Sequence, residues 1–105
     1  RYNFYEYLEC KKDTDTLLIS YGALSRVAYY FKNDFALYRP IRMYPLVEEI
    51  KIIAARYKRI IMMEMNTGQY VYEIERILHR EIKFIPIPGG RIDLGEIRQE
   101  IVKVG

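Results

Sequence analysis

The segment at residues 59–78 constrains the fold of this chain more than any other. It begins with an apolar run at 59–65, of the kind that forms a strand buried on both faces of a sheet. The run ends at Asn66-Thr67-Gly68, where Asn and Gly favour a sharp change of chain direction. A helix to about residue 80 is indicated by apolar residues at helical spacing: Val71, Ile74, Ile77 and Leu78. This strand, loop and helix predict an α/β fold, in which such a loop commonly contacts a ligand or partner.

The rest of the chain repeats this alternation. Further strands are expected at 4–9, 16–20, 35–38 and 83–87, and further helices at about 24–31, 46–57 and 94–104. Pro86 predicts an edge position for the last strand, because proline has no N–H to donate to a neighbour. Asp93 is placed to cap the last helix. The order β-β-α-β-α-β-α-β-α predicts a mainly parallel sheet with helices on both faces.

Length and composition indicate a single globular domain over residues 1–105. Half of the 105 residues are hydrophobic, which suits one core. The chain contains no apolar run as long as the roughly 18 residues that a membrane helix needs, so no membrane partner is expected. It does not begin with Met, and we therefore expect a piece of a longer polypeptide.

The charged residues and the single cysteine exclude several kinds of site. The net charge is +3, and the basic residues are scattered among acidic ones, so we expect no nucleic-acid partner. Cys10 is alone, which excludes an internal disulfide and a cysteine metal cluster; we expect an inert thiol in a reducing cytoplasm. The 11 tyrosines exceed what a small core buries, which predicts an aromatic contact surface.

Loops that leave parallel strands gather at one end of a sheet, and two of them contain a key glycine. If the chain crosses over after the second α/β unit, the loops at 22–25 and 66–69 flank a crevice. Backbone N–H groups at Gly22 and Gly68 could bind an anion there, with Arg39 or Arg91 nearby. The alternative is that these glycines only allow tight turns. No nucleotide-binding fingerprint accompanies them.

Glu64 ends a buried strand directly before the second of these loops. Three interpretations are open: its carboxylate pairs with Arg39, accepts backbone N–H groups, or contacts a partner. A catalytic acid or base is disfavoured, because the sequence places no second titratable group beside it. His79 lies near a helix C-terminus, where the helix dipole favours a structural role.

Three stretches together resemble a known family: Tyr21-Gly22 after the strand at 16–20, Tyr38-Arg39-Pro40-Ile41 with Pro45 beyond it, and Glu64-Met65-Asn66-Thr67-Gly68-Gln69. In type, order and spacing they are similar to the C-terminal region of the α subunit of 2-oxoacid:ferredoxin oxidoreductases. The resemblance runs from about residue 4 to residue 104, and the E-x-N-x-G-Q string is fairly specific for these enzymes. The chain departs from the family at Ala23, where Ser or Thr is usual, and in a shorter segment between Gly22 and Phe35.

The resemblance implies the transketolase C-terminal-domain fold. That fold is a three-layer α/β/α sandwich around a five-stranded, mostly parallel mixed sheet whose first short strand is antiparallel. The resemblance also implies a parent enzyme that decarboxylates a 2-oxoacid on thiamine diphosphate with Mg²⁺. The parent passes electrons through an iron–sulfur cluster to ferredoxin and transfers the acyl group to coenzyme A. These cofactors belong to other domains and subunits, so no catalytic, cofactor-binding or metal-binding residue is expected in this chain.

Two main hypotheses for the function follow. In the first, the chain is an assembly domain that packs against the remainder of the α subunit and the thiamine-binding β subunit. The residues expected to order its loops and interface are Arg39, Glu64, Asn66, Gly68, Gln69 and Gly22. In the second, it is a free-standing small α/β module that binds an anionic ligand at Gly22 and Gly68. A nucleic-acid binder is a third and weaker hypothesis.

Overall fold

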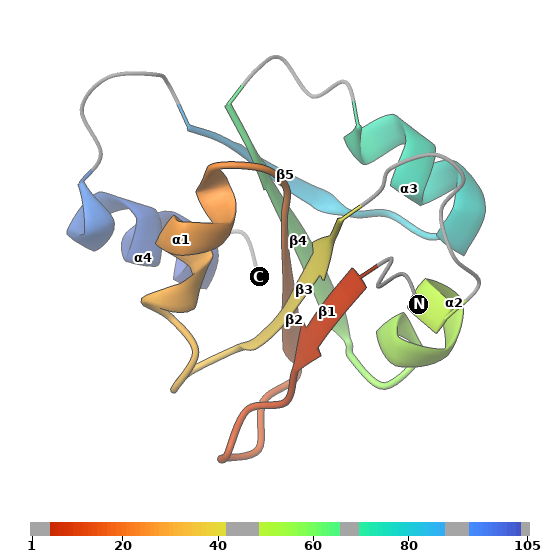
Figure 1. Ribbon diagram of the computed structural model, residues 1–105, viewed down its shortest axis with the longest axis horizontal. Helices are drawn as coiled ribbons and strands as arrows, with labels where there is room; N and C mark the ends of the chain where they lie inside the picture. The colour runs from red at the N-terminus through yellow and green to blue at the C-terminus, as the bar shows by residue number, and fades with distance from the viewer. Residues whose placement is uncertain (1–4, 42–48, 66–69, 88–92, 104–105) are drawn as a thin grey trace.

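The computed structural model describes residues 5–41, 49–65, 70–87 and 93–103 of the chain. Strands and helices alternate along these residues in the order that the sequence predicts (Figure 1). The elements are β1 (Tyr5–Leu8), β2 (Thr16–Ser20), α1 (Leu24–Tyr29), β3 (Ala36–Pro40), α2 (Glu49–Ala54), β4 (Arg59–Glu64), α3 (Val71–Leu78), β5 (Lys83–Pro86) and α4 (Leu94–Lys103). None of the helices in the described residues is long and apolar enough to cross a membrane.

The strands form one mixed sheet in the order β1-β3-β2-β4-β5. β2 pairs in parallel with β3 on one side and β4 on the other, and β5 pairs in parallel with β4. β1 pairs antiparallel with β3. The five-stranded sheet, its antiparallel first strand and the edge position of the Pro86 strand therefore match the expected fold.

The sheet is covered by helices on both faces, which gives three layers (Figure 1). Successive side chains of a strand point to opposite faces, and the buried side chains accordingly divide into two clusters. Leu17 and Ile19 pack on the face of α2 and α3, and Leu18 packs on the face of α1 and α4. All residues of β2 are buried, as expected for a central strand between two helical layers.

Helix ends differ from the predicted bounds. α2 ends at Ala54, short of the predicted residue 57, because the amides of Arg56 and Tyr57 bond to carbonyls only three residues back, in a tighter turn. α3 ends at Leu78 because His79 takes a left-handed conformation with φ of 55°. The predicted cap of α4 is confirmed, since the Asp93 carboxylate accepts the Glu96 N–H at 3.2 Å.

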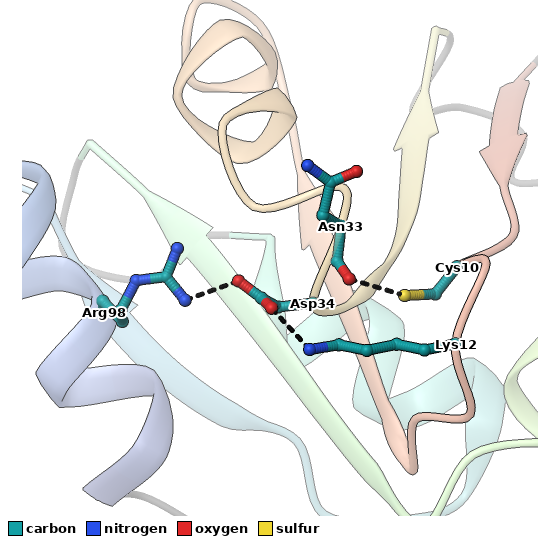
Figure 2. A network of polar contacts seen from close by, with 5 residues as sticks. All are labelled: Cys10, Lys12, Asn33, Asp34 and Arg98. Carbon is teal, nitrogen blue, oxygen red and sulfur yellow. Dashed lines mark hydrogen bonds and ion pairs between the residues drawn. The ribbon is translucent and has the colours of Figure 1, made fainter.

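One carboxylate joins three segments that are distant in sequence (Figure 2). Asp34, in the turn after α1, accepts hydrogen bonds from Lys12 at 2.8 Å and from Arg98 of α4 at 2.6 Å. Beside them, the Cys10 thiol donates to the Asn33 carbonyl at 3.3 Å. The hydrogen bonds from Lys12 and then Arg98 lower the pKa of Asp34 below its ordinary value of 3.8.

We expect Asp34→Asn to destabilise the fold in a pH-dependent way. A lowered pKa means that the folded state favours the ionised carboxylate. The Asp34 carboxylate therefore makes its full contribution to the free energy of unfolding above pH 3.8, its ordinary pKa. That contribution is lost as the pH falls through the lower pKa of Asp34 in the folded state. Urea unfolding should show a lower midpoint for the variant at about pH 7 and a shrinking difference toward about pH 2. Asp13→Asn, in the exposed turn before β2, is the control; an equal effect of both variants would contradict the role of Asp34.

Candidate functional site

The carboxyl ends of the central strands form the region where the candidate residues meet. β2 lies between β3 and β4, so the loops that follow β2 and β4 start side by side. The first leads to α1 on one face and the second to α3 on the other (Figure 1). This divergence is a topological switch point, as the predicted crossover requires. The loop residues Asn66, Gly68 and Gln69 lie outside the described residues.

Glu64 is the best-defined polar group of this region. It ends β4 and is only 5% exposed. One carboxylate oxygen accepts the Tyr70 N–H at 3.0 Å and the other accepts the Val71 N–H at 3.1 Å. The amides at a helix start have no partner within the helix, and the helix dipole favours a negative charge there. Glu64 therefore caps α3 from the neighbouring strand, where Tyr70 at the N-cap makes no side-chain cap.

Glu64 also joins β4 to the residues at the end of β5. The backbone carbonyl of Glu64 accepts the Ile87 N–H at 2.7 Å, just beyond β5. Glu64 thus holds both ends of the segment between β4 and α3 and anchors them to the sheet edge. Of the three interpretations of Glu64, acceptance of backbone N–H groups is the one that the structure bears out.

The pairing of Arg39 with Glu64 is wrong. Arg39 shares its face of the sheet with Leu37, on the side of α1 and α4, whereas Glu64 follows Met62 on the opposite face. Arg39 instead forms an ion pair with Glu6, its directly opposite residue on β1. Its Nε atom is buried and has no hydrogen-bond partner among the described residues.

Gly22 supplies the turn between β2 and α1. Its φ is +63°, a left-handed conformation that residues with a side chain adopt at a cost, although a Cβ atom here would meet nothing within 4 Å. The Gly22 carbonyl accepts the Ser25 N–H at 3.1 Å and the Ser25 hydroxyl at 2.8 Å. Backbone geometry alone thus explains this glycine, in agreement with the tight-turn interpretation.

Two tyrosine rings lie against each other at the switch point, a contact that the sequence did not reveal. Tyr21, after β2, and Tyr70, before α3, lie with ring centroids 5.0 Å apart. In a second ring pair, the fully buried Tyr38 stacks on Tyr5 at 5.3 Å, and burial raises the pKa of the Tyr38 hydroxyl. The abundance of tyrosine in the sequence indicates that such ring contacts exist. Which tyrosines meet depends on the order of the strands in the sheet.

The described residues carry little that acid–base or metal chemistry could use. In the part of the chain that the structure describes, no group of three or more His, Cys, Asp and Glu side chains could hold a metal ion. Both carboxylate oxygens of Glu64 already bind amides of the chain itself. The first described amides of the α3 start are therefore occupied by an internal anion, which weighs against an external anion at the same groups.

Comparison with known proteins gives one informative result. No protein-family model matches the chain, and no curated protein matches its sequence. A solved structure shares its fold: the 2-oxoglutarate:ferredoxin oxidoreductase from Magnetococcus marinus with 2-oxoglutarate, coenzyme A and succinyl-CoA bound. The TM-score is 0.78 at 18% sequence identity, over 97% of this chain and 20% of that chain. The chain thus has the fold of one part of that enzyme and spans about a fifth of its length.

We expect Glu64→Ala to destabilise the fold by about 2–4 kcal/mol, because it leaves two helix-start amides without their charged acceptor. Glu64→Gln should cost less, since the amide retains one acceptor oxygen. Urea unfolding measures both, and hydrogen exchange should accelerate at Tyr70 and Val71. Glu100→Gln, on the exposed surface of α4, is the matched control. Unchanged exchange at both amides would contradict the capping role.

Gly22→Ala should destabilise by about 1 kcal/mol through the left-handed backbone alone, since no atom obstructs the added methyl group. Asn tolerates this conformation better, so Gly22→Asn should cost less than Gly22→Ala. Thermal unfolding of the two variants measures the difference. A larger loss for Asn than for Ala would show that space, rather than backbone conformation, selects glycine here.

Proposed function

We propose that this chain is the transketolase C-terminal-like domain of the α subunit of a 2-oxoacid:ferredoxin oxidoreductase, where it acts in assembly. The observation that carries this proposal is the shared fold, which covers 97% of this chain but only 20% of the enzyme chain that it matches. A part of that size is a domain of a larger protein. The E-x-N-x-G-Q string at 64–69 supports the same assignment independently.

The role of Glu64 supports a positioning function. Its carboxylate is buried and binds two amides of its own chain, which leaves it unsuited to proton transfer. Asn66, Gly68 and Gln69 follow Glu64 in the sequence. In this proposal Glu64 fixes the start of α3, and these three residues contact a neighbouring domain or subunit.

Arg39 and Gly22 order the neighbouring elements. Arg39 binds Glu6 and so ties the antiparallel strand β1 to β3, and Gly22 sets the direction in which the chain enters α1. Both lie at the carboxyl ends of central strands, where the parent enzyme would place its contacts with the rest of the α subunit.

The chemistry of the parent enzyme would lie elsewhere. The parent would oxidatively decarboxylate a 2-oxoacid to an acyl-CoA in the cytoplasm, with thiamine diphosphate, Mg²⁺ and an iron–sulfur cluster held by other domains and by the thiamine-binding β subunit, and ferredoxin as electron acceptor. Within the described residues, no group of three or more His, Cys, Asp and Glu side chains could hold a metal ion. This domain would therefore affect the reaction through subunit contacts.

The proposal is tested by purifying the protein at its native length from its source cells. We expect a polypeptide several times longer than this chain, together with a partner subunit, thiamine diphosphate and iron. In that complex, Glu64→Gln should lower 2-oxoacid-dependent ferredoxin reduction and the yield of bound partner, whereas Glu100→Gln should change neither.

A native protein of about this size without any cofactor would overturn the proposal. A rise in its melting temperature with inorganic phosphate would then favour the anion-binding module.

A further inference from the structure

A groove of about 870 Å³ lies between α1 and the β1–β3 edge of the sheet. α1 and α4 cover β2, β4 and β5 on this face, and β1 contributes no side chain to their core. The face of β1 that carries Glu6 and Leu8 therefore lies outside this core and borders the groove. Its side chains there, Glu6 and Leu8, are exposed and line the groove together with Leu37 and Arg39 of β3.

The groove is positively charged. Its lining includes the cations Arg26, Lys32 and Arg39 and a single carboxylate, Glu6. The side of the groove formed by α1 and its flanking residues comes from residues 16–33, and this segment contains no Asp or Glu. Such a one-sided distribution contrasts with the mixed charges of the rest of the chain, and it favours a negatively charged occupant.

The cations of the groove retain donors that the described residues do not satisfy. Glu6 is bound by Arg39, yet the Nε atom of Arg39 is buried without a partner among the described residues. Arg26 is exposed, and none of the described carboxylates pairs with it. Lys32 likewise has no carboxylate partner among the described residues, so Arg26 and Lys32 are the two exposed cations of the groove that remain available to an acidic group.

The rim of the groove carries exposed aromatic side chains. Tyr29 and Tyr30 are 55% and 69% exposed, and Leu8 is 40% exposed. The Lys32 ammonium lies 4.3 Å from the centre of the Tyr29 ring and donates to its hydroxyl at 3.3 Å. Exposed tyrosines beside oriented cations are typical of protein interfaces. The aromatic contact surface expected from the tyrosine content stays a prediction, and these two exposed tyrosines are where this inference places it.

We propose that this groove binds an acidic segment of another domain or subunit of the parent enzyme. Carboxylates of that segment bind Arg26 and Lys32, and its apolar side chains pack on Leu8 and the two tyrosines. This inference rests on the assembly function proposed above and names the partner chemistry of one interface.

Zero-length crosslinking tests this contact in the native complex. A carbodiimide joins a lysine only to a carboxylate that touches it. Mass spectrometry should therefore find Lys32 linked to an Asp or Glu of another domain or subunit, and Lys32→Arg should remove that link. Links from Lys32 to a second copy of this chain alone, or no links, would overturn the proposal.

A charge-reversal pair measures the contribution of the groove. Arg26→Glu with Lys32→Glu should weaken association with the partner at least tenfold, and the loss should shrink as salt rises. Lys11→Glu with Lys58→Glu is the matched control, since both lysines are exposed and lie before β2 and β4, away from the groove. All four side chains are exposed, so equal melting temperatures should show that both proteins fold.

The outcomes separate this inference from the function on which it rests. If the partner co-purifies with the wild-type chain and binds the groove variant as tightly as the control, the groove proposal is wrong and the assembly function stands. If a native chain of this size has no partner at all, both are wrong.

Discussion

The parallel pairing of β2 with β4 is the constraint on which the rest of this structure depends. Both strands are buried on both faces, so each alternate side chain must belong to one of two separate cores. That alternation puts Glu64 beneath α3 and Arg39 on the side of α1. It also makes the loops after the two strands start together and diverge. The candidate site is a consequence of this central pair.

Glu64 shows how the fold tolerates a buried charge at its centre. A carboxylate removed from water is costly unless hydrogen bonds replace those to solvent. The start of α3 provides two N–H groups and the favourable end of a helix dipole, and the strand end provides the carboxylate. The carboxylate and the two N–H groups thus satisfy one another's hydrogen bonds. A carboxylate bound in this way positions the backbone, which supports the assembly function proposed above.

Much of the fold could be predicted because the local signals agree with one another. The apolar run before Asn66, the helical spacing from Val71 and the cap at Asp93 indicate their elements without tertiary information, and Pro86 correctly indicates an edge strand. Helix ends were less accurate, since the tight turn after Ala54 and the left-handed His79 depend on how the chain continues. The likeness to a part of a much larger enzyme agrees with the fold that the sequence resemblance implied.

The sequence by itself determined which segments are strands and helices and which glycine must turn the chain, because spacing, capping and backbone conformation are local properties. Only the tertiary structure decided which side chains meet. Arg39 and Glu64 both lie near the carboxyl ends of buried strands. The residues next to them in sequence do not show that the two side chains lie on opposite faces of the sheet, with Arg39 bound to Glu6. The tyrosine pair at the switch point and the cationic groove likewise exist only once the strand order β1-β3-β2-β4-β5 is set. Strand order is a long-range property, chosen by the packing of two cores at once.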